Sequence, residues 1–377
     1  MSLRSSEPIR ILGRGHPAIR ASHGKTLELT AESAITARAS CVVGVGAQLP
    51  AYPVAGPIRL TLSAADASVS WRAIGNSSWW PASGSAVIRR SGQRLPDTFA
   101  TDAEVAAGDL PRSLTEALAD PATTVALLVE RAAWPATGPA TLVRCRLAGT
   151  GPDRLLAEAA AAGAVLAEDP PARAWLSSAG IPVSATATAA GCLAAGGRVL
   201  AVAGGEGSDL TGLLAAADAV EVLGLPAELA VSAAAADHAP VLHAEGVRWR
   251  ELPLLAAAHP AMALTFRCPA DRLPRLLAEL GRERSSLVLA AMDDPERPVR
   301  GDLASLPLPD RGEVACRVAG LPAIADGPAI EPSELVRQLL AQSVTPRTVA
   351  LAVAALPGWS RRAAYQYVLA LSEQSAR

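Results

Sequence analysis

Twice in its middle third the chain passes from an apolar strand through a glycine-rich turn into a helix. Residues 141–147 (TLVRCRL) predict a strand that breaks at 149–153 (GTGPD), and residues 198–203 (RVLAVA) predict one that stops at 204–209 (GGEGSD). Strands that alternate with helices are typical of a parallel α/β sheet. Such sheets bind ligands at the carboxyl ends of their strands, where glycine lets a ligand approach backbone N–H groups. The pattern therefore predicts a ligand cleft, although such turns also serve simply to reverse the chain.

Two stretches rich in proline and glycine divide the chain, which at 377 residues exceeds a typical single core. They lie at residues 134–139 and 321–328. We therefore expect a β-rich α+β domain at 1–133, an α/β domain at 140–320 and a helical tail at 331–377.

The first domain is expected to be β-rich because its apolar segments are short, rich in β-branched residues and partly alternating with polar ones. The predicted strands are 41–45, 58–62, 69–74, 86–89 and 124–130, with a helix at about 104–119. The tail is expected to form three helices in a helix-turn-helix-like arrangement. Thr345 followed by Pro346 is a typical start for the second of them, since threonine caps helices and proline suits the first helical position.

Composition and charge exclude several classes of protein. A formal net charge of −2 argues against a protein that coats nucleic acid by charge alone. Acidic residues and proline interrupt the most apolar stretch, 210–236, so no membrane span is expected. Residues 1–10 lack the apolar core of a signal peptide, and we expect a cytoplasmic protein. The cysteines form no C-x-x-C pair, so neither a metal site nor a disulfide framework is expected. They are Cys41, Cys145, Cys192, Cys268 and Cys316.

The middle region carries further motifs in a fixed order. After the two glycine turns come CPADRL at 268–273, RGDL at 300–303 and RGEV at 311–314. In this order the segment resembles the bacterial methyltransferases that methylate a cytidine ribose 2′-hydroxyl in small-subunit ribosomal RNA. Those enzymes belong to the tetrapyrrole-methylase superfamily. The resemblance implies S-adenosylmethionine as cofactor, a two-lobed α/β fold and ribosomal RNA or the small ribosomal subunit as partner, with a homodimer as one possible assembly.

The same resemblance implies the residues of the site. The cofactor would be bound by the two glycine turns and by the proline of a third loop. These residues are Gly149, Gly151, Gly204, Gly205, Gly207 and Pro226. A base that takes the proton of the acceptor hydroxyl would come from carboxylates near the turns. The candidates are Asp153, Glu168 and Asp169, each of which also suits a helix cap or a solvated surface.

The segment departs from the family at polar positions. The second turn lacks the family's leading Ser-Asp and its closing Thr-Pro, and residues 292–296 replace a motif that contains a lysine. Two interpretations therefore stay open. The chain is either an S-adenosylmethionine-dependent ribose methyltransferase with weakened or lost catalysis, or a non-enzymatic RNA- or nucleotide-binding protein on the same scaffold.

The tail carries Arg347, Arg361 and Arg362 near the starts of its predicted helices, and resembles the C-terminal segment of the same methyltransferases. The helix dipole favours acidic rather than basic residues at these positions. Contact with RNA phosphates is therefore one explanation of these arginines. A solvated helical cap on the domain is the other.

The first domain concentrates ionisable residues in a short segment. GHPAI at 15–19 and HGKTLELT at 23–30 resemble the opening of an archaeal family of uncharacterised function, and the likeness extends over about 8–130. The segment includes Lys25, the only lysine of the chain. We predict an anion or nucleotide site in this segment. A third interpretation of the protein is therefore that its activity lies in the first domain, around His16 and His23. The histidines also suit a structural role. A metal is not expected, because a third ligand is missing. The predicted site residues are His16, His23, Lys25, Thr26 and Glu28.

Overall fold

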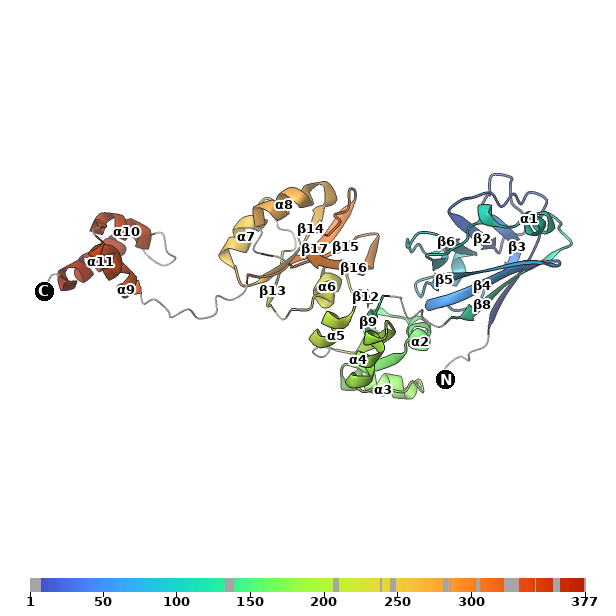
Figure 1. The fold of residues 1–377 in the computed structure, drawn as a ribbon, viewed down its shortest axis with the longest axis horizontal. Coiled ribbons are helices and arrows are strands. Elements are labelled where there is room, and N and C mark those ends of the chain that lie inside the picture. Colours follow the sequence, from blue (N-terminus) through green and yellow to red (C-terminus); the bar gives the residue numbers. More distant parts are fainter. Residues whose placement is uncertain are drawn as a thin grey trace. The chain divides into compact units, whose positions relative to one another are not determined.

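The computed structural model divides into two compact units, Met1–Leu321 and Pro322–Arg377 (Figure 1), which are treated separately. The described residues are 8–132, 139–205, 210–237, 239–244, 249–280, 284, 286–302, 306–321, 332–342, 344–354 and 360–375. Within these ranges no helix combines the length and apolarity needed to cross a bilayer.

The first domain is a closed β-barrel in which the strands follow the order β1-β3-β2-β6-β7-β5-β4-β8. Its strands are β1 (Ile9–Arg14), β2 (Thr26–Thr30), β3 (Val42–Gln48), β4 (Gly56–Ala64), β5 (Ala67–Gly75), β6 (Ser85–Arg89), β7 (Thr98–Thr101) and β8 (Thr124–Arg131). Antiparallel pairing of the first strand with the last, with Ile9 opposite Val129, closes the ring. Closure leaves no open sheet edge.

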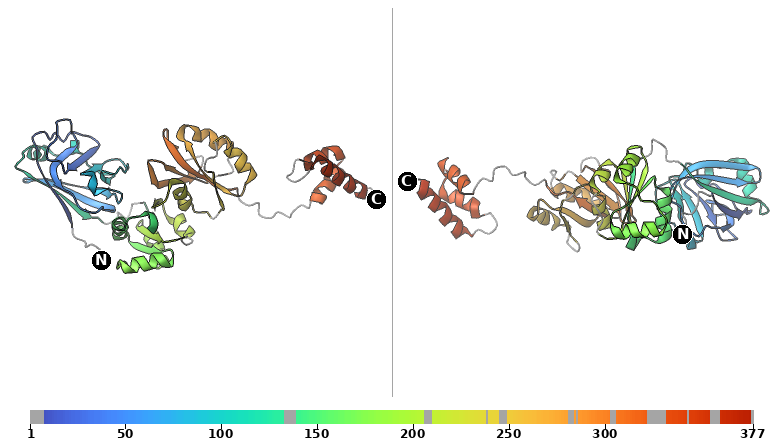
Figure 2. Two further views of the ribbon diagram at one scale, coloured as in Figure 1. Left: turned by 180° about the vertical axis from the view of Figure 1, so that it is seen from behind. Right: turned by 90° about the horizontal axis from the view of Figure 1, so that it is seen from below.

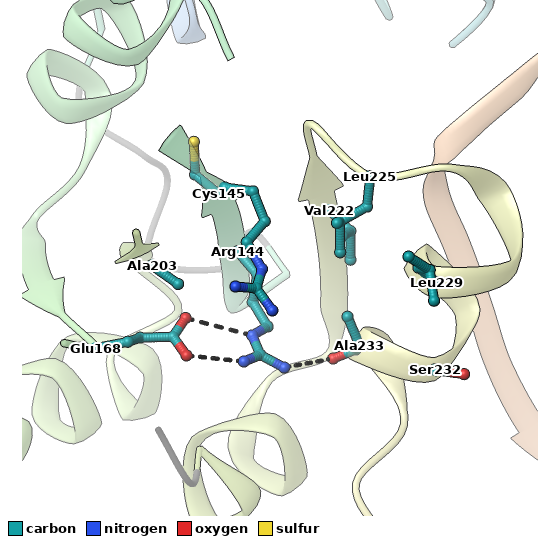
Figure 3. A pocket seen from close by; sticks show the side chains of 10 residues that line it. Arg144, Cys145, Glu168, Ala203, Val222, Leu225, Leu229, Ser232 and Ala233 are labelled. Atoms are coloured by element: carbon teal, nitrogen blue, oxygen red, sulfur yellow. Dashed lines mark hydrogen bonds and ion pairs between the residues drawn. The ribbon is translucent and has the colours of Figure 1, made fainter. Parts of the chain in front are cut away.

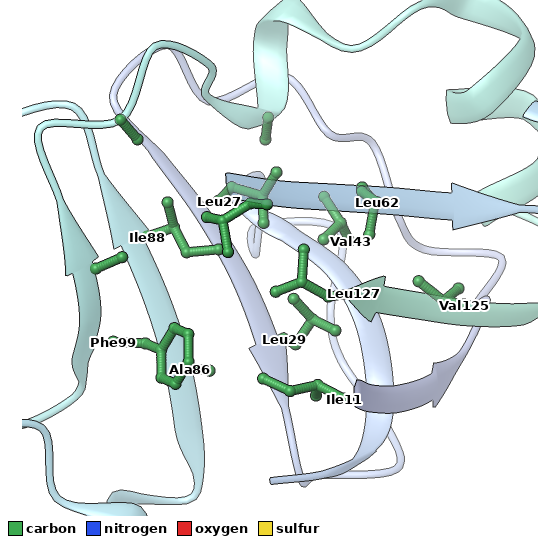
Figure 4. Packing of buried hydrophobic residues seen from close by; sticks show 14 of the residues in the cluster. Ile11, Leu27, Leu29, Val43, Leu62, Ala86, Ile88, Phe99, Val125 and Leu127 are labelled. Carbon is green, nitrogen blue, oxygen red and sulfur yellow. The ribbon is translucent and has the colours of Figure 1, made fainter. Parts of the chain in front are cut away.

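Alternation along the strands fills the barrel with apolar side chains, because successive residues of a strand point to opposite faces. Leu27 and Leu29 of β2 are fully buried (Figure 4), whereas Thr26 and Glu28, which alternate with them, are half-buried. The helix expected at about 104–119 is wrong over its first half. A 3-10 turn, Ala107–Asp109, is followed by Pro111, which disfavours helix at the residue before it, and α1 (Arg112–Leu118) begins only after this proline.

The middle region begins with a parallel sheet in the order β10-β11-β9-β12. Its strands are β9 (Thr141–Arg146), β10 (Ala164–Ala167), β11 (Arg198–Ala203) and β12 (Ala219–Leu223). Helices α2 (Pro152–Ala161) and α3 (Pro170–Ser178) share a core with one face. Helices α4 (Thr186–Ala194), α5 (Thr211–Ala216) and α6 (Ala227–Ala234) share a core with the other (Figure 2). The parallel α/β arrangement expected from the alternating pattern is confirmed.

A second sheet follows in the order β13-β14-β17-β15-β16, antiparallel except where β13 meets β14. Its elements are β13 (Val241–His243), α7 (Leu252–Ala258), β14 (Ala263–Pro269), a 3-10 turn (Ala270–Arg272), α8 (Leu273–Leu280), β15 (Ser286–Ala291), β16 (Asp294–Asp302) and β17 (Glu313–Val318). Helices α7 and α8 pack on one face. Val288, Ala290 and Ala315 of the other face join the core of α6. Helix α6 therefore packs against both sheets and fixes the two lobes together.

The C-terminal unit is helical. Helices α9 (Pro332–Ala341), α10 (Pro346–Ala354) and α11 (Arg361–Ser375) pack around a small core of their own. Val336, Val349 and Val368 contribute one buried side chain from each helix. The backbone N–H of Ala363 donates to Ser360 Oγ at 3.1 Å, so this serine caps the start of α11.

Candidate functional site

A cleft of about 300 Å³ lies where strands β9, β11 and β12 end against α6 (Figure 3). Apolar side chains form one part of its wall, and two arginines, a glutamate and a serine form the rest. The lining residues are Arg144, Cys145, Arg146, Glu168, Ala203, Val222, Leu225, Leu229, Ser232 and Ala233. The carboxyl ends of parallel strands are the usual ligand-binding edge of an α/β sheet. The cleft therefore lies at the edge of the sheet that the strand–turn–helix pattern predicts, but none of the described glycines of the two turns lines it.

Arg144 crosses this cleft and joins its walls. Nη2 lies 2.8 Å from Oε2 of Glu168 and Nε lies 3.5 Å from Oε1, while Nη1 donates to the carbonyl of Ala233 at 2.9 Å (Figure 3). The Glu168 side chain is 1% exposed. Its carboxylate is thus held by a guanidinium fork, a strong and geometrically specific pairing. The same arginine binds the last turn of α6, where helix carbonyls attract cations.

Asp169 connects two loops rather than facing the cleft. Its carboxylate accepts the N–H of Ala172 at 2.9 Å, which caps α3, and the N–H groups of Gly204 and Gly205 at 2.9 Å and 2.7 Å. Burial raises the pKa of Asp169, but the three N–H donors and the positive charge of Arg146 outweigh burial, so the net pKa is lowered. The geometry gives Asp169 a structural role, and its role as a base stays a prediction.

The glycines of the turns allow close backbone packing. A Cβ on Gly149 would lie 2.2 Å from the carbonyl oxygen of Gly224, which itself has a φ of 76°. A Cβ on Gly204 would lie 2.7 Å from Cβ of Pro171. Gly149 and Gly204 are therefore needed for contacts within the protein itself, whatever else they contact. By contrast, a Cβ on Gly151, the residue before α2, meets nothing within 4 Å.

The remaining predicted residues of this region lie apart from the cleft lining. Asp153 is exposed in the first turn of α2, where a negative charge favours the helix dipole. Pro226 precedes α6 and lines a second cavity beside the barrel. Gly207 lies outside the described residues. The structure thus brings Glu168, Asp169 and the backbone of Gly204 to one edge of the sheet and leaves Asp153 on the surface.

A buried chain of ion pairs joins the barrel to both lobes, and sequence reasoning missed it. Glu158 of α2 accepts from Ser77 of the barrel at 2.6 Å and from Arg198 of β11 at 2.7 Å. Arg198 also donates to Glu221 of β12 at 2.6 Å, and Glu221 accepts from Arg94 of the barrel at 2.9 Å. A charged residue inside an otherwise apolar strand, as in both β11 and β12, is the one signal that could have indicated these pairs.

Another arginine extends this junction to the second lobe. Arg154 of α2 donates from Nη1 to Oε1 of Glu296 at 2.8 Å, and Ser78 of the barrel donates to Oε2 of the same glutamate at 3.2 Å. Because Glu296 belongs to β16, the barrel, the parallel sheet and the second lobe all meet at this point.

The polar motif of the barrel stabilises local turns. Nδ1 of His16 accepts the N–H of Ala18 at 3.1 Å, and Nδ1 of His23 accepts the N–H of Thr26 at 3.1 Å. These bonds make both imidazoles turn-forming groups. Lys25 is exposed. Its predicted role in ligand binding stays a prediction.

Glu28 of the same motif binds two neighbouring side chains. Its carboxylate accepts from Ser85 Oγ at 2.7 Å and from Cys41 Sγ at 3.2 Å. Burial, together with Glu28, raises the pKa of the Cys41 thiol to about 11, so this cysteine is a neutral donor rather than a nucleophile. Among the described residues no group of three metal-ligating side chains is placed to hold an ion.

The tail arginines lie on the surface of the C-terminal unit. Arg347 of α10 and both Arg361 and Arg362 of α11 are exposed. Tyr365, one turn after Arg361, is 45% exposed. Exposed arginines beside an aromatic ring suit a nucleic acid surface, and equally a solvated one. RNA binding by these residues stays a prediction.

Comparisons with known proteins give a family for part of the barrel only. A family model described as a domain of unknown function (DUF371) matches residues 11–78. The resemblance of the opening motif to a family of unknown function is thus confirmed over this stretch, which includes His16 to Glu28. No curated protein matches the chain.

Solved structures are similar to about half of the chain. One is the crystal structure of the methyltransferase CobJ, with 16% identity and a TM-score of 0.19 over 49% of this chain and 95% of that one. Another is the cobalamin biosynthesis precorrin-6Y methylase CbiE from Archaeoglobus fulgidus, with 15% identity and a TM-score of 0.19 over 48% of this chain and 98% of that one. With TM-scores this low the likeness is weak and says nothing of cofactor or substrate. The closer resemblance to ribosomal RNA methyltransferases stays a prediction.

Proposed function

We propose that the α/β domain binds a nucleotide in the cleft at the carboxyl ends of its parallel strands and catalyses no methyl transfer. The observation that supports binding is the composition of the wall. Val222, Leu225 and Leu229 offer an apolar surface for a base, and Arg146 supplies positive charge for a phosphate. The buried hydroxyl of Ser232, also in the wall, has no hydrogen-bond partner among the described residues.

The state of the nearby carboxylates argues against catalysis. Methyl transfer to a hydroxyl needs a base or a water within reach of the acceptor proton. Glu168 is bound by Arg144, and the oxygens of Asp169 accept three backbone N–H groups. S-adenosylmethionine also carries a sulfonium cation, which the Arg146 guanidinium in the same cleft repels. The residues present therefore do not fit this cofactor as a methyl donor.

Calorimetric titration of the full chain with AMP, adenosine and S-adenosylmethionine tests the proposal. AMP should bind about tenfold or more tightly than adenosine, because a charge-assisted hydrogen bond contributes roughly 1.5–3 kcal/mol. Arg146→Gln should remove that preference. Arg173→Gln, an exposed arginine on α3, is the matched control and should keep it. Equal affinities for AMP and adenosine, or no heat with AMP at about 1 mM, would refute nucleotide binding here.

The second candidate is an S-adenosylmethionine-dependent ribose methyltransferase that acts on small-subunit ribosomal RNA. What favours it is that the turns at Gly149 and Gly204 follow adjacent parallel strands, as the sequence resemblance implies. Incubation of the chain with labelled S-adenosylmethionine and small ribosomal subunits separates the two candidates. Incorporation of label into RNA would overturn the non-catalytic proposal. Replacing the three tail arginines with glutamine should then weaken RNA binding and flatten its salt dependence.

A further inference from the structure

A second cavity, of about 490 Å³, lies where the barrel, the parallel sheet and the second lobe meet. It is separate from the nucleotide cleft, although Leu225 contributes to the wall of both. Junctions between domains are common places for small-molecule sites. The cavity is lined by Ser78, Arg94, Leu95, Pro96, Arg154, Gly224, Leu225, Pro226, Asp293, Asp294, Pro295 and Glu296.

Arg94 gives this cavity a buried and incompletely bonded cation. Its side chain is 5% exposed, and Nη2 donates to Glu221 at 2.9 Å. Its other two nitrogen atoms, Nε and Nη1, are buried and have no hydrogen-bond partner among the described residues. Leaving the donors of a charged group unbonded in the interior is unfavourable. The arrangement therefore favours an acceptor supplied from the cavity.

Asp293 and Asp294 give the cavity an excess of negative charge. Asp293 is exposed in the turn between β15 and β16, and Asp294, the first residue of β16, is half-buried. Within the described ranges neither carboxylate has a hydrogen bond or ion pair. Glu296, by contrast, is bound by Arg154. Burial raises the pKa of Asp294, and the positive charges of Arg94 and Arg297 oppose that effect without a hydrogen bond or ion pair to the carboxylate. Arg94 and Asp294 thus line the same cavity without a direct bond between them.

We propose that this cavity binds a zwitterion of the amino acid type, with its carboxylate at Arg94 and its ammonium at Asp293 and Asp294. An anion alone would leave the half-buried carboxylate of Asp294 without a partner, and a cation alone would leave Arg94 without an acceptor. Leu95, Pro96 and Leu225 line the same space and suit an aliphatic side chain. Nε and Nη1 of Arg94 are covered, so binding requires a small change of its side-chain torsions that exposes these N–H groups to the ligand.

Calorimetry with the full chain tests both halves of the ligand. L-leucine is compared with isocaproate, which lacks the ammonium, and with isoamylamine, which lacks the carboxylate. L-leucine should bind, and the affinity for each analogue should be lower by a factor of about ten or more. L-glutamine and L-arginine are titrated in parallel, so that the result does not depend on one side chain.

Variants locate the site. Changing both Asp293→Asn and Asp294→Asn should weaken the binding of the amino acid about tenfold, whereas isocaproate, an anion relieved of two negative neighbours, should bind no more weakly than before. The variant concerns a hairpin turn, and an unchanged melting temperature shows that it folds. Asp66→Asn, on the exposed turn between β4 and β5, is the matched control and should bind like the wild type. The proposal is overturned if none of the three amino acids binds at about 10 mM, or if isocaproate binds as tightly as L-leucine.

Discussion

Replacing Arg198 with methionine tests whether the buried ion pairs hold the domains together. Its Nη2 donates to Glu158 at 2.7 Å and to Glu221 at 2.6 Å, and the three side chains are 4%, 2% and 6% exposed. Methionine keeps much of the volume but removes the charge, so two buried carboxylates lose their shared cation. Removing one partner from a buried pair destabilises a protein by roughly 3–5 kcal/mol.

The remaining contacts place the expected loss near the lower end of that range. Glu221 keeps Arg94, whereas Glu158 keeps only the hydroxyl of Ser77 among these partners. We therefore expect the free energy of unfolding of Arg198→Met to fall by about 3 kcal/mol, mostly because of Glu158. Arg112→Met is the control, because Arg112 pairs with Glu116 on a surface helix with its side chain 92% exposed. Such exposed pairs contribute about 0.5 kcal/mol or less.

Urea denaturation followed by circular dichroism at about pH 7 measures both variants. A double-mutant cycle with Glu158→Gln then isolates the pair, and the double variant should recover part of the loss because no unpaired charge is left at Glu158. If Arg198→Met is no less stable than Arg112→Met, the buried pairs do not stabilise the junction and the reasoning fails.

Two further predictions follow from the same region. Burial raises the pKa of Glu221, but Arg198 and the neighbouring arginines outweigh burial, so the net pKa is lowered. The ionised carboxylate therefore stabilises the fold above its ordinary pKa of 4.5, and this stabilisation is lost as the pH falls below that value. Melting temperatures measured from about pH 7 to about pH 3 should therefore fall less steeply for Glu221→Gln than for the wild type, and parallel curves would contradict this. Gly149→Ala forces its Cβ against Gly224 and should destabilise the protein by about 3 kcal/mol or more, whereas Gly151→Ala has open space and should change stability by a few tenths. Similar denaturation midpoints for the two alanine variants would show that the loops separate without cost.

The local part of the fold could be predicted from the sequence, and the distant pairings could not. The strand–turn–helix pattern placed Glu168, Asp169 and Gly204 at one edge of a sheet. There the backbone N–H of Gly204 donates a hydrogen bond to the Asp169 carboxylate. The part that Arg144 plays at that edge was not predicted, because this arginine binds the carbonyl of Ala233, which lies 89 residues further along the chain. Periodicity reports which face of an element is apolar, but not which charge of one domain will meet which charge of another.

The barrel was also only partly predictable. Short alternating strands indicated β structure, yet closure depends on β1 pairing with β8, and no local pattern records that pairing. The error at 104–119 came from treating the segment as one continuous helix in spite of Gly108 and Pro111. Helix propensity is a weak guide where a proline lies within the segment.

Closure of the barrel also bears on the order in which this protein folds during synthesis. Strand β8 lies between β4 and β1, and it is the last barrel strand to be made. Until residue 131 has emerged from the ribosome, β1 and β4 each lack this neighbour and expose unpaired backbone groups. Exposed edges of this kind promote association between nascent chains, and pairings distant in sequence form slowly. The first domain therefore becomes resistant to aggregation in one late step, just before the parallel sheet begins to emerge.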